Sequence, residues 1–193
     1  MYLPLAISFA IAVLIAGPVT SFIGYYIPAM IFGSVLMAVA TGLITTFAPD
    51  TPPVKWISYQ ILYGLGIGLA FQQPYTAVQT VLPEAQVPTA LVVLSFAQQV
   101  GSIVALSIAQ NVFVDRLSAK VAGQVPGLDV RTVVSGGALG IVQKVPPQFR
   151  EQVLKSYNEV IVYVLYIALG LTCLTTIGAL GIEWRSVKEE KEE

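Results

Sequence analysis

The chain has 193 residues, of which 55% are hydrophobic and 11% are charged, with a formal net charge of -1 and a mean hydropathy of +0.76. This composition excludes a disordered chain and argues against an ordinary water-soluble domain, in which about a quarter of the residues are charged. The chain has no histidine, one cysteine and no basic excess. These features exclude nucleic-acid binding, disulfide frameworks, Cys/His metal sites and histidine-based acid–base catalysis, so no enzymatic activity, metal or cofactor is expected.

Five charge-poor apolar segments predict five transmembrane helices, since each is long enough for the ~20 residues that cross a ~30 Å hydrocarbon core. The first 49 residues carry no charged side chain at all, and they hold two of these segments. We expect spans at about residues 3–22, 27–47, 54–81, 89–114 and 157–184. The predicted fold class is therefore all-α: one polytopic membrane helix bundle over residues 1–184, followed by a charged tail at 185–193.

One long connection, residues 115–156, joins the last two predicted spans. Pro146 and Pro147 are typical of a helix start, and apolar residues recur after them at about helical spacing. One interpretation is a short amphipathic helix on the membrane surface, with a second helix at 131–142. A loosely ordered loop is the alternative, and the sequence favours neither.

Amide side chains are concentrated in the third and fourth predicted spans. Polar groups in a bilayer face protein or a water-filled cavity, so these two spans are expected to line something polar. The candidates for a substrate cavity are Gln60, Gln72, Gln73, Gln79, Gln98 and Gln99. The alternative is that these amides bond only to neighbouring helices and hold the bundle together.

Small residues and one proline predict close packing and a bend in the same two spans. Gly64 and Gly68 form a small-xxx-small pair that lets another helix approach closely, and Gly101 offers a similar point in the fourth span. Pro74 removes a backbone hydrogen bond beside two glutamines and is expected to kink the third span. No charged residue lies deep in any predicted span, so the chain alone lacks the ionisable group that proton-coupled transporters commonly place at membrane depth.

Several short strings carry a family resemblance. They are Gly24-Tyr-Tyr-Ile-Pro28, Thr41-Gly-Leu-Ile-Thr-Thr46, Trp56-Ile-Ser-Tyr-Gln60, Phe71-Gln-Gln-Pro74 and Phe96-Ala-Gln-Gln-Val-Gly101. Together they resemble the late spans of fungal fourteen-span drug:proton antiporters of the major facilitator superfamily, the group with mycotoxin and multidrug efflux pumps. The chain differs from that family in length, because it resembles only the last five spans.

The resemblance implies part of a secondary transporter that exports small organic compounds such as toxins, drugs or secondary metabolites, in exchange for protons. It implies that the first, third and fourth spans line the cavity, and that the protein lies in the plasma membrane. An alternative of another class is a membrane interaction module, or a truncated fragment, that needs a second polypeptide carrying the missing spans. In each case the lipid bilayer is a partner.

The orientation in the membrane is ambiguous from the sequence. The positive-inside rule favours a cytoplasmic 115–156 loop, because the side of that loop would carry seven of the ten Lys and Arg residues. The resemblance implies the opposite, a cytoplasmic carboxyl terminus. We favour the second orientation, because the charge rule is weak where the earlier spans that set topology are not part of the chain.

Overall fold

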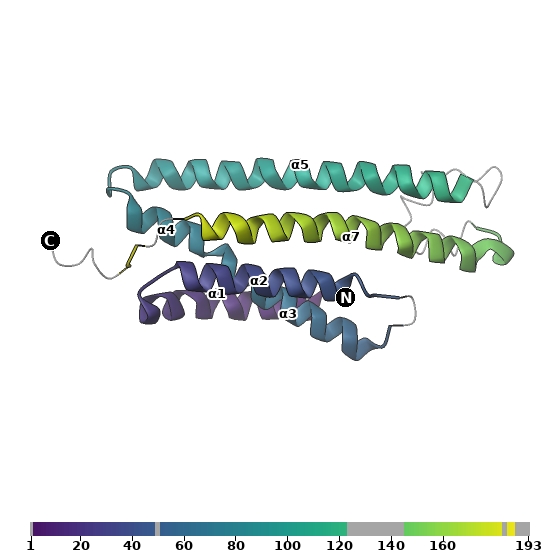
Figure 1. The fold of residues 1–193 in the computed structure, drawn as a ribbon, viewed down its shortest axis with the longest axis horizontal. Helices are drawn as coiled ribbons and strands as arrows, with labels where there is room; N and C mark the ends of the chain where they lie inside the picture. The colour runs from purple at the N-terminus through teal and green to yellow at the C-terminus, as the bar shows by residue number, and fades with distance from the viewer. Residues whose placement is uncertain (1, 49–50, 123–144, 183–184, 188–193) are drawn as a thin grey trace.

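The structure is a computed structural model that describes residues 2–48, 51–122, 145–182 and 185–187 (Figure 1). Its elements are helices: α1 (Leu3–Ile23), α2 (Ile27–Ile44), α3 (Pro53–Phe71), α4 (Gln73–Val81), α5 (Val87–Ala122), the 3-10 turn η1 (Pro147–Phe149) and α7 (Arg150–Leu180). Among the described residues, the only β-type backbone pairing is an isolated antiparallel bridge between Tyr25 and Ser186. The predicted all-α fold class is confirmed.

Local sequence signals explain where the first helices begin and end. A proline occupies the first turn of α1, α2 and α3, where its missing N–H costs no helical hydrogen bond. Gly24 ends α1 with a φ of 82°, a left-handed conformation that glycine adopts without strain, and its N–H donates to the Thr20 carbonyl at 2.8 Å. The result is a tight reversal that brings α2 back along the same bundle.

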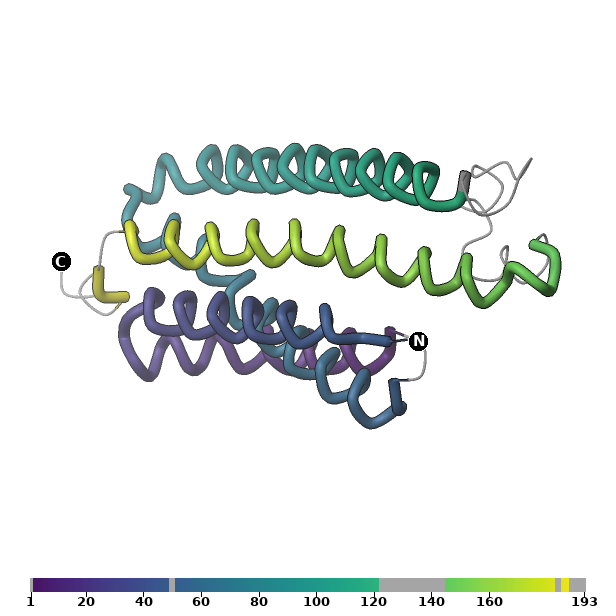
Figure 2. Tube along the Cα trace, turned by 45° about the vertical axis from the view of Figure 1, so that its right-hand side comes forward, coloured from purple at the N-terminus to yellow at the C-terminus, as the bar shows by residue number. Residues whose placement is uncertain are grey.

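The helices run roughly along one long axis, with α1, α2 and α3 on one side, α7 in the middle and α5 on the far side (Figures 1 and 2). Helix α3 packs against both α1 and α2, while α7 packs against both α2 and α5. Helix α4 connects the two sides by contacting α5. No residue in the most apolar stretch of α5 is buried, so much of this helix has no packing partner within the described residues.

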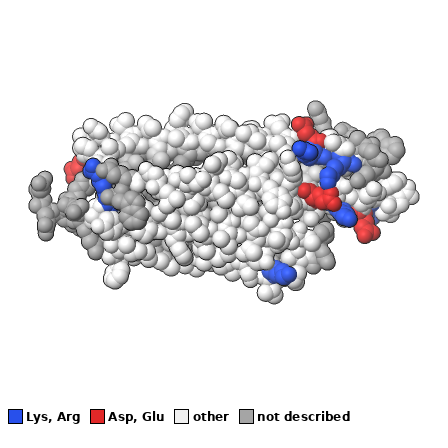
Figure 3. Space-filling view, in the orientation of Figure 1, with Lys and Arg blue, Asp and Glu red and all other residues white. Residues whose placement is uncertain are grey.

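Four helical segments within the described residues are long and apolar enough to cross a membrane: Leu3–Ile23, Ile27–Ile44, Val87–Val121 and Pro147–Leu180. The predicted third span is instead divided at Gln72 into α3 and α4, and neither part is among the four. Figure 3 shows the charged side chains at the two ends of the visible face and an uncharged band between them. That distribution suits a helix bundle set across a bilayer. A joint crossing by α3 and α4 stays a prediction.

The structure differs from the predicted boundaries around the long connection. Helix α5 continues to Ala122 rather than 114, and α7 begins at Arg150 rather than 157. The residues after Pro146 therefore form the 3-10 turn η1 and the first turns of α7, and not a separate surface helix. The physical reason is a small apolar cluster, which holds both helices together beyond the uncharged band; it is made of Leu117, Val121, Val145, Val153 and Val160. The helix expected at 131–142 and the tail from residue 188 lie outside the described residues.

Candidate ligand pocket

The break between α3 and α4 is built around one proline and one buried glutamine. Pro74 has no N–H, so the helical hydrogen bond to the Ala70 carbonyl cannot form and the helix is interrupted at Gln72. The Gln73 side chain is 1% exposed. Its Nε2 donates to the Leu69 carbonyl at 3.1 Å, and its Oε1 accepts a 3.1 Å hydrogen bond from the Thr20 hydroxyl of α1. Both ends of this amide are therefore satisfied by protein at the break.

Beside the break lies a pocket of about 400 Å³, lined by residues from α2, α3, α4, α5 and α7. Met30, Met37, Ile67 and Phe71 are among its mainly apolar walls. None of the described residues that line it is ionisable. A volume of this size, with apolar walls and few polar groups, is typical of sites for small organic molecules.

Three polar side chains line the pocket, and they differ in what they offer a ligand. The hydroxyls of Ser34 and Thr175 donate to carbonyls of their own helices, at 2.9 Å and 2.7 Å. Gln98 of α5 accepts a 2.6 Å hydrogen bond from the Tyr75 hydroxyl through its Oε1. The NH₂ group of Gln98 donates to no described residue, and an amide nitrogen carries two donors. Gln98 is therefore the polar group in this pocket that is best placed to bind a ligand acceptor such as a carbonyl.

The six predicted cavity glutamines do not come together at this pocket. Gln98 lines it, and Gln72 lies half-buried at the adjacent break, while Gln73 is buried behind the break in the contact with α1. Gln79 and Gln99 are exposed on the outside of the described structure. Gln60 lies in α3, away from the break, and lines a different cavity. The described residues therefore place these amides in different surroundings, and their role in a substrate cavity stays a prediction.

The predicted packing residues also separate into two groups. A Cβ on Gly64 would lie 2.6 Å from the Leu5 carbonyl oxygen, and one on Gly68 would lie 2.8 Å from that of Phe9, so α1 and α3 touch backbone to backbone here. A Cβ on Gly101 would meet nothing within 4 Å among the described residues, and close packing at that position stays a prediction.

Sequence reasoning missed several residues at the pocket and in the helix contacts beside it. Gly66 of α3 lies against the α2 backbone, where a Cβ would come within 2.6 Å of the Met37 nitrogen. Gly66 is two residues from Gly64 and from Gly68, which places it on the opposite face of the helix. This spacing in the sequence could have predicted a second close contact on that face. Tyr75, the donor to Gln98, had no signal, because the pairing joins residues on two separate helices.

The chain is similar over nearly its whole length to curated fungal transport proteins. It is 44% identical over 179 residues to the efflux pump aflT of Aspergillus parasiticus, covering 92% of this chain and 35% of that protein. It is 38% identical to the efflux pump roqT of Penicillium rubens, covering 99% of this chain and 35% of that protein. It is 39% identical to the MFS-type transporter VdtG of Byssochlamys spectabilis, covering 99% and 34%.

The chain spans about a third of the length of these relatives. No protein-family model and no solved structure matches it. The similarity therefore concerns one part of each relative.

Proposed function

Since nearly the whole chain is homologous to a part of fungal MFS-type efflux pumps, we propose that it forms the carboxyl-terminal wall of a substrate pathway in such an exporter. The pocket at the α3–α4 break carries this proposal. It is the place where residues of four long helices and a helix interruption line a small, largely apolar space. Interrupted helices beside a cavity are a recurrent feature of binding sites in membrane transporters.

The chemistry of the pocket indicates a class of substrate. Apolar walls with Met30, Met37 and Phe71 favour flat or flexible hydrophobic compounds, and methionine adapts to varied shapes. The Gln98 amide would bind a carbonyl or another neutral acceptor. Since no ionisable group among the described residues lines the pocket, we propose that the substrate is neutral there and that any exchange for protons uses residues outside it. No covalent bond is made or broken in such a function.

We further propose a plasma-membrane location with a cytoplasmic carboxyl terminus, on the resemblance described above. The long exposed surface of α5 supports the view that further spans cover this helix in the working transporter. Two sources would supply them: other parts of the same polypeptide, as in the curated relatives, or a second chain. An independent interaction module has no observation in its favour.

A chimera tests the proposal. This chain replaces the aligned third of aflT, and efflux of a panel of neutral fluorescent dyes is measured in yeast cells that lack their own drug exporters. We expect export by the chimera and weaker export by its Gln98→Leu variant. A chimera that reaches the cell surface at the level of the parent but exports a panel of such dyes equally with and without Gln98 contradicts the pocket assignment.

A further inference from the structure

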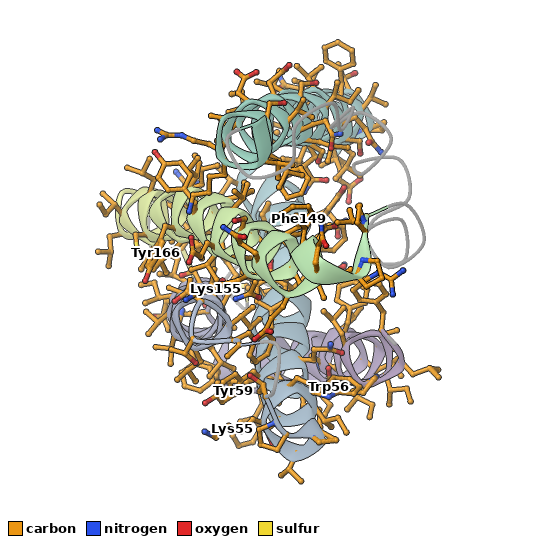
Figure 4. The ribbon with its side chains drawn as sticks, turned by 90° about the vertical axis from the view of Figure 1, so that its right-hand side faces the viewer. Lys55, Trp56, Tyr59, Phe149, Lys155 and Tyr166 are labelled. Carbon is orange, nitrogen blue, oxygen red and sulfur yellow. The ribbon has the colours of Figure 1, made fainter. Side chains whose placement is uncertain are left out.

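A second cavity, of about 510 Å³, is lined by Tyr2 just before α1 and by described residues of α3, α7 and the α2–α3 connection. It shares no lining residue with the pocket at the α3–α4 break. Figure 4 views the bundle from this end, where Trp56 and Tyr59 project from the first turns of α3 and Lys155 projects from α7. The cavity is thus at the end of the bundle where most of the described charges gather (Figure 3), the level at which tryptophan commonly anchors a protein at the membrane surface.

Gln60 lines this cavity and has an unusual environment. Its Oε1 is shielded from solvent and accepts no hydrogen bond from any described residue. The other amide in the lining, Asn158, already donates from Nδ2 to the Phe47 carbonyl at 3.3 Å. A shielded carbonyl oxygen without a donor is unfavourable, and the terminal torsion of glutamine is soft. A small rotation of this amide would let a donor that enters the cavity satisfy it.

The remaining walls define what kind of molecule carries that donor. Trp56 and Phe47 contribute aromatic surface, and the Phe47 ring is fixed by stacking on Tyr59 with 5.6 Å between ring centroids. Ile161 and Leu165 of α7 contribute aliphatic surface. Among the described residues no charged side chain lines the cavity, so these walls offer an ammonium or a carboxylate no counter-charge.

We propose that this cavity is a second small-molecule site, which binds neutral aromatic or alicyclic compounds through a hydroxyl group donated to Gln60. The ligand would come either from the membrane, as a sterol-type lipid hydroxyl, or from water, as a phenol. The proposal does not depend on the transport function, because it concerns binding at a site separate from the pocket.

Bromine quenching of Trp56 tests it in the purified chain reconstituted in phosphatidylcholine nanodiscs. The chain has two tryptophans, so a Trp184→Phe background leaves Trp56 as the single reporter. The probes are 4-bromophenol and 4-bromoanisole, which differ in the hydroxyl donor, with free concentrations corrected for partition into empty nanodiscs. We expect 4-bromophenol to bind about 3- to 10-fold more tightly, the range that one net hydrogen bond supplies.

Gln60→Leu removes the acceptor and should abolish the preference, while Gln110→Leu, an exposed amide on α5, should keep it. Equal binding of the two probes by the unmodified background overturns the proposal even if Gln60→Leu fails to fold. A preference that persists in a folded Gln60→Leu variant overturns it as well. Ergosterol added to the nanodiscs identifies the source: competition that depends on Gln60 indicates a membrane sterol, and its absence indicates a soluble ligand.

Discussion

The Thr20 hydroxyl of α1 donates a 3.1 Å hydrogen bond to Gln73 Oε1 at the start of α4, joining residues 53 positions apart in the sequence. The two side chains are 3% and 1% exposed. Because the same amide also donates to the Leu69 carbonyl, one buried side chain fixes the helix break and anchors it to α1. The geometry of the neighbouring pocket depends on this break.

Thr20→Val should therefore destabilise the chain. The substitution keeps the shape of the side chain but leaves the Gln73 oxygen buried without its donor. Hydrogen bonds between membrane helices contribute about 0.6 kcal/mol on average and up to about 1.7 kcal/mol, and the Thr20→Val change should fall within that range. The measurement is the free energy of unfolding by SDS in mixed micelles.

Thr46→Val is the matched control, because the exposed Thr46 hydroxyl bonds only the Leu43 carbonyl of its own helix end. A double variant, Thr20→Val with Gln73→Leu, should lose less stability than the sum of the two single variants. Strict additivity would show that the two side chains are not coupled.

Alanine substitutions should separate the buried glycines of α3 from an open glycine in α5. Gly66→Ala places a methyl group 2.6 Å from the Met37 backbone nitrogen, and Gly64→Ala places one 2.6 Å from the Leu5 carbonyl oxygen. Neither backbone can retreat without moving a helix, so each change should cost about 1–3 kcal/mol. The midpoint of thermal unfolding in detergent reports the effect.

In the same experiment, Gly101→Ala should have the opposite effect on stability. Its Cβ meets nothing within 4 Å, and alanine lowers the conformational entropy of the unfolded chain, so stability should stay equal or rise by up to about 1 kcal/mol. Equal destabilisation by all three substitutions would mean that glycine matters for helix flexibility and not for close approach.

The helical content followed from the sequence because hydropathy and missing charge act on whole segments. The all-α bundle was predictable, and so was an irregularity near Pro74, because a missing N–H interrupts a helix wherever it falls. The length of α7 was not predictable, because the contact of Val153 with the Leu117 cluster forms only once α5 and α7 lie side by side.

The candidate site was less predictable than the fold. The six glutamines are similar in a sequence, but the rotation of each helix about its own axis decides which of them face a common space. That rotation is set by packing, for example by Gly66 on α2 and Gly68 on α1. Gln73 and Gln98 therefore differ in burial and partners although both lie in polar stretches of their spans.

The pocket should discriminate between ligands by the Gln98 amide. In the aflT chimera, Gln98→Leu should lower the apparent affinity for a carbonyl-bearing substrate about 3- to 10-fold, because it removes the donor in an apolar space. Tyr75→Phe leaves Gln98 in place but removes the hydroxyl that holds its Oε1, so a smaller loss is expected. Concentration-dependent efflux measures both.

Gln110→Leu, an exposed amide on the same helix, serves as the control and should change the affinity less than Gln98→Leu. If Gln98→Leu and Gln110→Leu weaken export to the same degree, α5 contributes a general polar surface and the pocket has no special role.

The apolar cluster at the charged end should control how α5 is held. Helix α5 contacts α4 near its start and α7 near its end, and the second contact contains Leu117, which is fully buried. Leu117→Ala should cost about 2–4 kcal/mol through lost burial and a cavity. Leu106→Ala, on a residue of the same helix that is 69% exposed, should cost far less.

Polar contacts lie beside this cluster, but they should contribute little to holding the end of α5 against α7. Lys120 pairs with Glu159, and the Arg116 guanidinium lies 4.6 Å from the Tyr163 ring centre, yet these groups are exposed and solvent weakens such pairs.

Double electron–electron resonance between a label on Cys173 of α7 and a label on an introduced cysteine in α5 would follow the helix separation. Since apolar burial holds the end of α5, Leu117→Ala should broaden the distance distribution, and Lys120→Gln should leave it nearly unchanged. Broadening by Lys120→Gln alone would assign that end of α5 to electrostatics instead.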